Sequence, residues 1–118
     1  MLGDDEFGLT HTIGLSAGMT IQFLEADWQV PGVRGIAVSE EGFNVIEAAL
    51  APLRDEVMID KFAVTALTRE QTRLVAKVLG QAAQAASHSS PEARLLAGVS
   101  GYLATLTERG LGAHVCGI

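Results

Sequence analysis

The chain has 118 residues, a net charge of −6 and one cysteine, so it can bury a core as a single domain, residues 1–118, without a disulfide or metal. Negative charge disfavours contact with a nucleic-acid backbone, and no apolar run approaches the roughly 18 residues of a transmembrane helix. The acidic start at residues 1–6 lacks the pattern of a secretory signal, so we expect a cytoplasmic protein with no membrane contact and a frayed N-terminus.

The charge is unevenly distributed along the chain. Residues 1–60 contain 11 Asp or Glu against 2 Arg, a balance of −9, whereas residues 61–118 contain 3 Glu against 6 Lys or Arg, a balance of +3. An acidic surface attracts a basic protein partner, although a negative balance also simply keeps a protein in solution. Both readings stay open from the sequence.

Three strands are predicted in the first third of the chain. Apolar residues alternate with small or polar ones over 7–15 and again over 19–28, which is the period of an extended strand. The alternation changes phase at 23–24, which predicts a β-bulge. Proline and glycine at 31–32 predict a type II turn, and the β-rich stretch 33–38 then returns as the second strand of a hairpin.

A helix is predicted to follow, with Ser39 as its cap and Glu40 and Glu41 in the first turn, where the helix dipole favours negative charge. Pro52 ends or kinks this helix, because proline lacks an amide hydrogen and clashes with the preceding turn. The segment 55–60 joins it to the next element and has the composition of a further short strand.

In the stretch 61–86, strand, cap and helix signals agree best, so we predict that it is the core of the fold. An extended segment at 62–67 leads to Thr68, and Gln71 lies three residues later, as in a capping box. Apolar residues then recur at steps of three and four to Ala86, opposite a polar face.

The last third predicts a helix and a strand. Ser90 caps a helix that has Pro91 in its first position, where proline is tolerated. Gly98 and Gly101 predict close backbone packing on one flank of this helix, because glycine is costly in a helix interior. Gly110 ends the helix, and 112–118 is the closing strand.

The predicted order is therefore β-β-β-α-β-α-α-β. This order fits an α+β fold in which a small mixed or antiparallel sheet is covered on one face by about three helices.

No catalytic or metal site is predicted. Ser16 lies in a literal G-x-S-x-G, but a hydrolase needs a helix directly after that serine, and here a strand is expected. His114 and Cys116 share a strand face that His11 could approach, but zinc needs further ligands that the sequence does not supply at the usual spacing. We therefore expect no enzyme activity, no metal and no cofactor.

Several segments together show a resemblance to a known class. The helix start Ser-Glu-Glu-Gly-Phe at 39–43, the strand-to-helix switch Lys-Phe-Ala-Val-Thr-Ala-Leu-Thr-Arg-Glu-Gln at 61–71 and the closing His-Val-Cys-Gly-Ile at 114–118 resemble the small acidic α+β immunity proteins encoded beside bacterial polymorphic toxins. The likeness extends over most of 19–118. It implies a binding protein that inhibits a cognate toxin, commonly a basic nuclease. The docking face that it implies consists of Glu25, Asp27, Glu40, Glu41 and Glu47.

Trp28 is the single tryptophan, and it either packs in the core or anchors the partner beside these carboxylates. A second hypothesis is a self-associating structural or accessory domain, in which the small-residue flank of the third helix packs against a second copy to form a homodimer.

Overall fold

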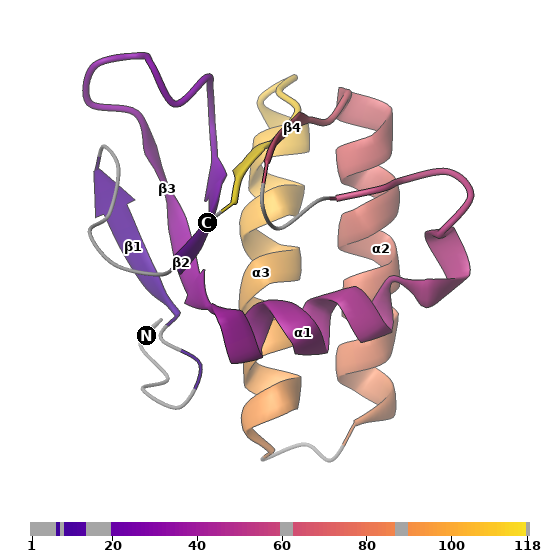
Figure 1. Ribbon diagram of the computed structural model, residues 1–118. Coiled ribbons are helices and arrows are strands. Elements are labelled where there is room, and N and C mark those ends of the chain that lie inside the picture. The colour runs from indigo at the N-terminus through magenta and orange to yellow at the C-terminus, as the bar shows by residue number, and fades with distance from the viewer. Residues whose placement is uncertain (1–6, 8, 14–19, 60–62, 87–89, 118) are drawn as a thin grey trace.

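The structure, a computed structural model, describes residues 7, 9–13, 20–59, 63–86 and 90–117 (Figure 1). The described elements, in chain order, are β1 (Thr10–Ile13), β2 (Thr20–Leu24), β3 (Arg34–Ser39), α1 (Glu40–Ala49), the 3-10 turn η1 (Ala51–Leu53), β4 (Val64–Ala66), α2 (Arg69–Ala85), α3 (Pro91–Glu108) and β5 (His114–Cys116). The predicted order of strands and helices is confirmed. The predicted fraying of residues 1–6 lies outside the described residues.

The five strands form one sheet in the order β1-β3-β2-β5-β4, with every pair antiparallel. Residues that pair directly across an antiparallel sheet share a face, so Phe23 of β2 lies on the same face as its neighbours Ile36 of β3 and Val115 of β5. All three side chains are fully buried in the core. This face is therefore the one that the helices cover.

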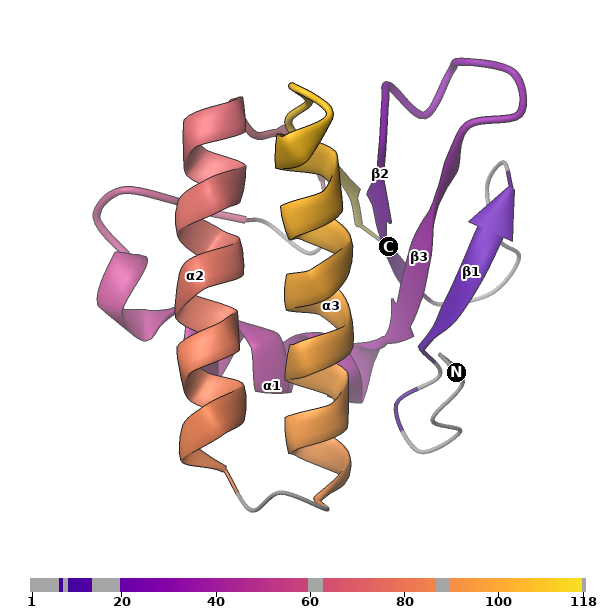
Figure 2. The ribbon, with the colours of Figure 1, turned by 180° about the vertical axis from the view of Figure 1, so that it is seen from behind.

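All three helices lie on that face (Figures 1 and 2). α2 and α3 pack side by side along their lengths, and α1 crosses them on the side nearer the sheet. Each helix contributes one apolar stripe to the core, represented by Ile46 of α1, Leu79 of α2 and Leu103 of α3, which are all fully buried. The predicted α+β fold with helices on one face of a small sheet is confirmed, and the sheet is antiparallel.

Local signals set the ends of the helices as predicted. Ser39 Oγ accepts a hydrogen bond from the Gly42 amide at 3.1 Å, and Thr68 and Gln71 form both bonds of the capping box. At the end of α3, Gly110 has a φ of 78°, and Leu111 N donates to Leu106 O at 2.9 Å, as in a Schellman motif. These contacts satisfy backbone groups that a helix otherwise leaves unpaired.

The stretch 61–86, which was predicted to be the core of the fold, begins with a strand that does not lie at the centre of the sheet. β4 spans 64–66 within the described residues and is the edge strand beside β5. Val64 is 50% exposed and Ala66 is also exposed, because they pair with Cys116 and His114 of β5 and so lie on the sheet face that the helices do not cover. The helical half of the prediction is correct, since Val75 and Leu79 of α2 are fully buried.

The predicted bulge at 23–24 is wrong. β2 keeps a regular register with β3 from Thr20 to Leu24, and the strand ends there. The change of phase in the sequence arises because both faces of β2 are buried: Leu24 is fully buried on the face opposite Phe23, and Gln22 Nε2 on that same side donates to Thr12 Oγ1 at 3.3 Å.

At the other edge of the sheet, the predicted first strand is shorter, with β1 at 10–13. Phe7 and Leu9, which precede it, are buried as predicted, but His11 and Ile13 are exposed because β1 lies beyond the cover of the helices. Part of the predicted strand, residues 8 and 14–15, lies outside the described residues. The segment 55–59 forms turns and irregular chain rather than the strand that its composition allowed.

The predicted close packing at Gly101 is also wrong. A Cβ atom at Gly101 would meet nothing within 4 Å, whereas one at Gly80 of α2 would lie 3.1 Å from Ser100 Oγ of α3. Ser100 Oγ also donates to Ala76 O at 2.7 Å, so the two helices approach closely at this point. Gly101 faces outward from the bundle.

Candidate protein-binding face

The six predicted docking residues fall into two groups at opposite ends of β3 (Figure 1). Glu25, Asp27 and Trp28 lie in the connection between β2 and β3, whereas Glu40, Glu41 and Glu47 lie on α1. The six residues of β3 separate the two groups by about 20 Å at the usual rise of a strand. The structure therefore does not bring the six residues together as one patch.

Glu25 is engaged within the protein itself. Its carboxylate accepts a hydrogen bond from Arg109 Nη1 at 3.1 Å, and this ion pair ties the β2–β3 connection to the C-terminal end of α3. Asp27 Oδ1 accepts from the Gln29 amide at 2.9 Å and so shapes the turn that follows. These contacts give both carboxylates a local structural role.

Tyr102 of α3 completes this link. Its hydroxyl donates to Arg34 O at 3.4 Å, and desolvation by burial raises the pKa of Tyr102 to about 12, with a further upward contribution from Glu25 and an opposing one from Arg109. Trp28, in the same connection, is 38% exposed, so it is an exposed side chain rather than part of the core.

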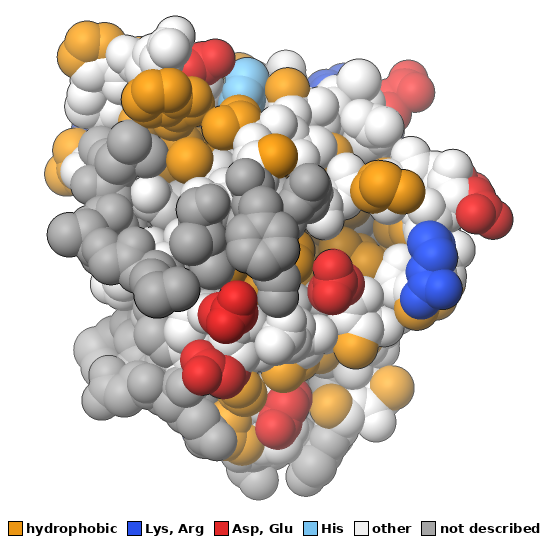
Figure 3. Space-filling model, in the orientation of Figure 1, with side chains coloured by type: hydrophobic (Ala, Val, Ile, Leu, Met, Phe, Trp, Pro, Cys, Tyr) orange, Lys and Arg blue, Asp and Glu red, His pale blue; other side chains and the backbone are white. Residues whose placement is uncertain are grey.

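The second group forms an acidic surface on α1, which we call the α1 face: Glu41, Asn44, Glu47, Ala48 and Ala51. All five residues are exposed, and their spacing places them along the outer side of the helix and its extension into η1. Figure 3 shows acidic side chains gathered over this part of the molecule. Neither Glu41 nor Glu47 forms an ion pair with any residue that the structure describes.

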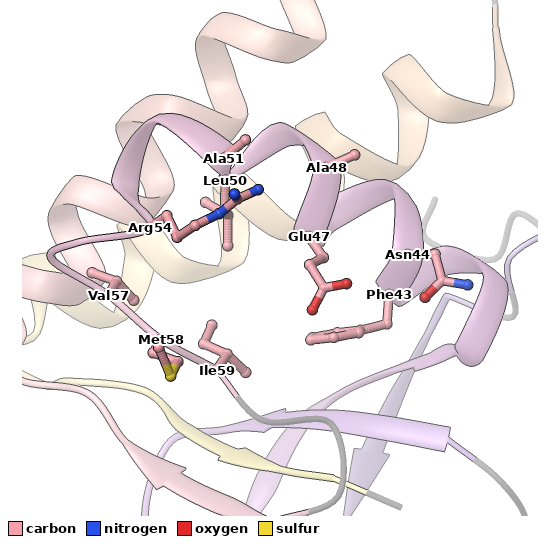
Figure 4. Close-up of a pocket in the computed structure, with 10 residues that line it drawn as sticks. All are labelled: Phe43, Asn44, Glu47, Ala48, Leu50, Ala51, Arg54, Val57, Met58 and Ile59. Atoms are coloured by element: carbon pink, nitrogen blue, oxygen red, sulfur yellow. The ribbon is translucent and has the colours of Figure 1, made fainter.

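A hollow of about 400 Å³ lies beside the α1 face, between α1 and the irregular segment that follows η1 (Figure 4). The described residues that line it are Phe43, Asn44, Glu47, Ala48, Leu50, Ala51, Arg54, Val57, Met58 and Ile59. Figure 4 shows the Glu47 carboxylate beside the Phe43 ring and directed into the hollow. Most of the residues that line the hollow are apolar, and the polar side chains of Asn44, Glu47 and Arg54 line it as well.

This combination is suited to a long basic side chain. Lysine and arginine lay their aliphatic stems along apolar surface while the charged end remains at a polar group. Ile59 supplies apolar surface in the hollow, and Glu47 supplies the opposite charge. Met58, which is 78% exposed, adds an adaptable apolar side chain at this surface.

Sequence reasoning identified Glu47 and missed the hollow. The other wall comes from 57–59, a segment without helical or strand period, and nothing local indicates that it folds back against α1. Only the turn after η1, in which Val57 N donates to Leu53 O at 2.8 Å, brings this segment there.

His11, His114 and Cys116 do not converge. His114 and Cys116 of β5 lie on the same face of the sheet as their partners Leu24 and Gln22 of β2. His11 of β1 pairs with Ile36 and therefore lies on the opposite, helix-covered face of the sheet. Burial raises the pKa of the Cys116 thiol. In the described part of the chain, no three His, Cys, Asp or Glu residues are placed to hold a metal ion. Ser16 lies outside the described residues.

The fold and the hollow thus define a small α+β domain with an acidic helix face beside an apolar depression. Comparisons with protein-family models, with curated proteins and with solved structures found no match to this chain. Among the helices that the structure describes, none has the length and apolar character needed to cross a membrane.

Proposed function

We propose that this protein is a non-enzymatic binding protein that docks a basic protein partner on the α1 face. The observation that carries the proposal is the position of Glu47, whose carboxylate lies beside the apolar walls of the hollow and has no ionic partner among the described residues. A lysine or arginine of the partner would enter the hollow and pair with Glu47, and Glu41 would strengthen the attraction at longer range.

The resemblance to the immunity proteins of polymorphic toxins supports a finer proposal. The partner is then a bacterial toxin, and the protein inhibits it in the cytoplasm by covering a basic surface that the toxin needs for its substrate. Glu25 and Asp27 have internal roles, so we assign the principal contact to α1, with Trp28 at the margin of the docked partner.

The proposal is tested by capture from a bacterial lysate on immobilised protein, followed by mass spectrometry. The wild type is compared with the double variant Glu41→Lys/Glu47→Lys and with a matched control, Glu70→Lys/Glu108→Lys, which makes the same charge change at exposed positions of α2 and α3. We expect one basic protein to be retained by the wild type and the control, lost by the α1 variant, and weakened in about 1 M salt, where the Debye length is about 3 Å.

Retention of the same protein by both double variants would contradict the assignment to α1, because binding would then not depend on the α1 carboxylates. Loss of the protein from both variants would contradict it as well, because net charge alone would then explain binding. Once a partner is identified, the inhibitory part of the proposal is tested separately. Expression of the partner alone should arrest growth of the host, and co-expression of the wild type, but not of the α1 variant, should restore it.

A further inference from the structure

A groove runs along the outer surface of α2 and α3, on the side turned away from the sheet (Figure 2). Two adjoining hollows of about 440 and 360 Å³ form it and share Gly80, Gln84 and Ser100. We call this the α2–α3 groove and define it by Arg73, Lys77, Gly80, Ala97, Ser100 and Gly101. Small residues line the bottom of the groove and leave space above it, and the space next to Gly101 is open.

Basic side chains line one side of this groove. Arg73 and Lys77 lie one turn apart on α2, both are exposed, and neither forms an ion pair with a described residue. None of the described residues that line the groove is acidic. The groove therefore carries positive charge, although the whole chain is acidic.

The α1 face has the complementary properties. It is a helix surface on which the carboxylates of Glu41 and Glu47 accompany the small side chains of Asn44 and Ala48. It lies on the opposite side of the α2–α3 pair from the groove, as comparison of Figures 1 and 2 shows. One copy of the protein thus presents an acidic, narrow helix surface on one side and a basic, shallow groove on the other.

We propose that the α2–α3 groove binds the α1 face of a second copy of this chain. Small residues on both surfaces allow helices to approach to the 8–10 Å between axes at which they pack. Arg73 and Lys77 then meet Glu41 and Glu47. The reverse arrangement, groove against groove, would place Arg73 and Lys77 opposite their own copies, and such like-charge contacts oppose association.

The contact joins two different surfaces, so it is heterologous and adds copies head to tail. It also covers the surface proposed for the basic partner. Self-association and partner binding therefore exclude one another, and the free protein would release its α1 face when a basic partner competes for it. The self-association itself does not depend on the existence of that partner.

The test is sedimentation equilibrium of the purified protein. We expect the average mass of the wild type to rise with concentration at low salt and to fall towards that of one chain in about 1 M salt. Two variants separate the surfaces: Ala48→Trp obstructs the α1 face and Ala97→Trp obstructs the groove. Both positions are exposed, so a tryptophan at either leaves the core unchanged, which circular dichroism verifies.

Each variant alone should remain a single chain. An equimolar mixture should form a one-to-one complex and nothing larger, because the intact α1 face of the Ala97→Trp chain fits the intact groove of the Ala48→Trp chain. The proposal is overturned if the wild type stays a single chain throughout. It is equally overturned if only Ala97→Trp prevents association and mixing does not restore it, since that result identifies a groove-to-groove dimer.

Discussion

Thr72 Oγ1 accepts a hydrogen bond from the backbone amide of Ala113 at 2.9 Å, in the fully buried space between α2 and the start of β5. The same hydroxyl donates to Thr68 O at 2.8 Å, so one side chain satisfies two backbone groups that lie 45 residues apart in the sequence. This contact holds the chain just before β5 against the first turn of α2.

Replacement of Thr72 by valine keeps the shape of the side chain and removes the hydroxyl. The Ala113 amide would then be buried without a partner, and we expect a loss of about 1–3 kcal/mol in the free energy of unfolding. Urea denaturation measures it. Thr105→Val is the matched control, because Thr105 makes a similar helix hydrogen bond, to Gly101 O, at an exposed position and should change stability by at most about 0.5 kcal/mol. Equal effects of the two changes would contradict a special role for Thr72.

Gly112 and Gly101 should respond to alanine in opposite directions. A Cβ atom at Gly112 would collide with Leu67 O and lie 2.9 Å from the carbonyl carbon of Thr68, and neither backbone atom can move freely. We expect Gly112→Ala to destabilise the protein by about 2 kcal/mol or more, by overpacking. Gly101→Ala adds a methyl group in open space within a helix and should stabilise it by up to about 1 kcal/mol. Thermal denaturation of the two variants tests both signs.

The hydroxyl of Tyr102 should lose its proton at an unusually high pH. Because Tyr102 is the single tyrosine, the absorbance of its phenolate can be followed directly. Its pKa is raised to about 12 in the folded protein from an ordinary value of 10.0, so folding favours the protonated hydroxyl. Its contribution to stability is complete below pH 10 and is lost as the pH rises through about 12. Glu25→Gln should lower this pKa, because the negative charge of Glu25 helps to raise it, and Arg109→Gln should raise it. A midpoint near 10 in the folded wild type would contradict the burial of this group.

Trp28 offers a direct test of whether the single tryptophan belongs to the core. Because it is 38% exposed in a connecting segment, we expect Trp28→Ala to cost about 1 kcal/mol of unfolding free energy or less. Phe23→Ala, at a fully buried position of β2, should cost about 3–5 kcal/mol. Similar costs for the two changes, measured in urea, would place Trp28 in the core after all.

Much of the fold was predictable because its signals are local. Ser39, Thr68 and Ser90 each accept a hydrogen bond from the amide of the third residue of the helix that they cap, and Gly110 takes the positive φ that ends α3. Apolar residues at steps of three and four then define the buried side of each helix. Interactions of this kind join residues within one turn of each other, so the sequence alone reveals them.

The strands were predicted less well, since alternation at period two shows which side chains share a face but not which strands are neighbours. The sequence predicted β4 as a core strand, but it is an edge strand of the sheet. Its position could not be predicted, because only the tertiary arrangement places β5 between β4 and β2. The two-sided burial of β2 was likewise taken for a bulge, because contacts on its second face, such as that of Gln22 with Thr12 of β1, form only when the strands assemble into the sheet.

The same distinction applies to the candidate site. The sequence by itself determined that acidic residues concentrate before residue 61 and that Glu40, Glu41 and Glu47 belong to one helix. Only the tertiary structure decided which carboxylates are available: Glu25 is paired with Arg109, 84 residues away, whereas Glu47 lies beside a hollow whose other wall comes from 57–59. Charge and helical period are properties of neighbouring residues, but pairing and concavity arise from contacts between segments that the chain brings together only when it folds.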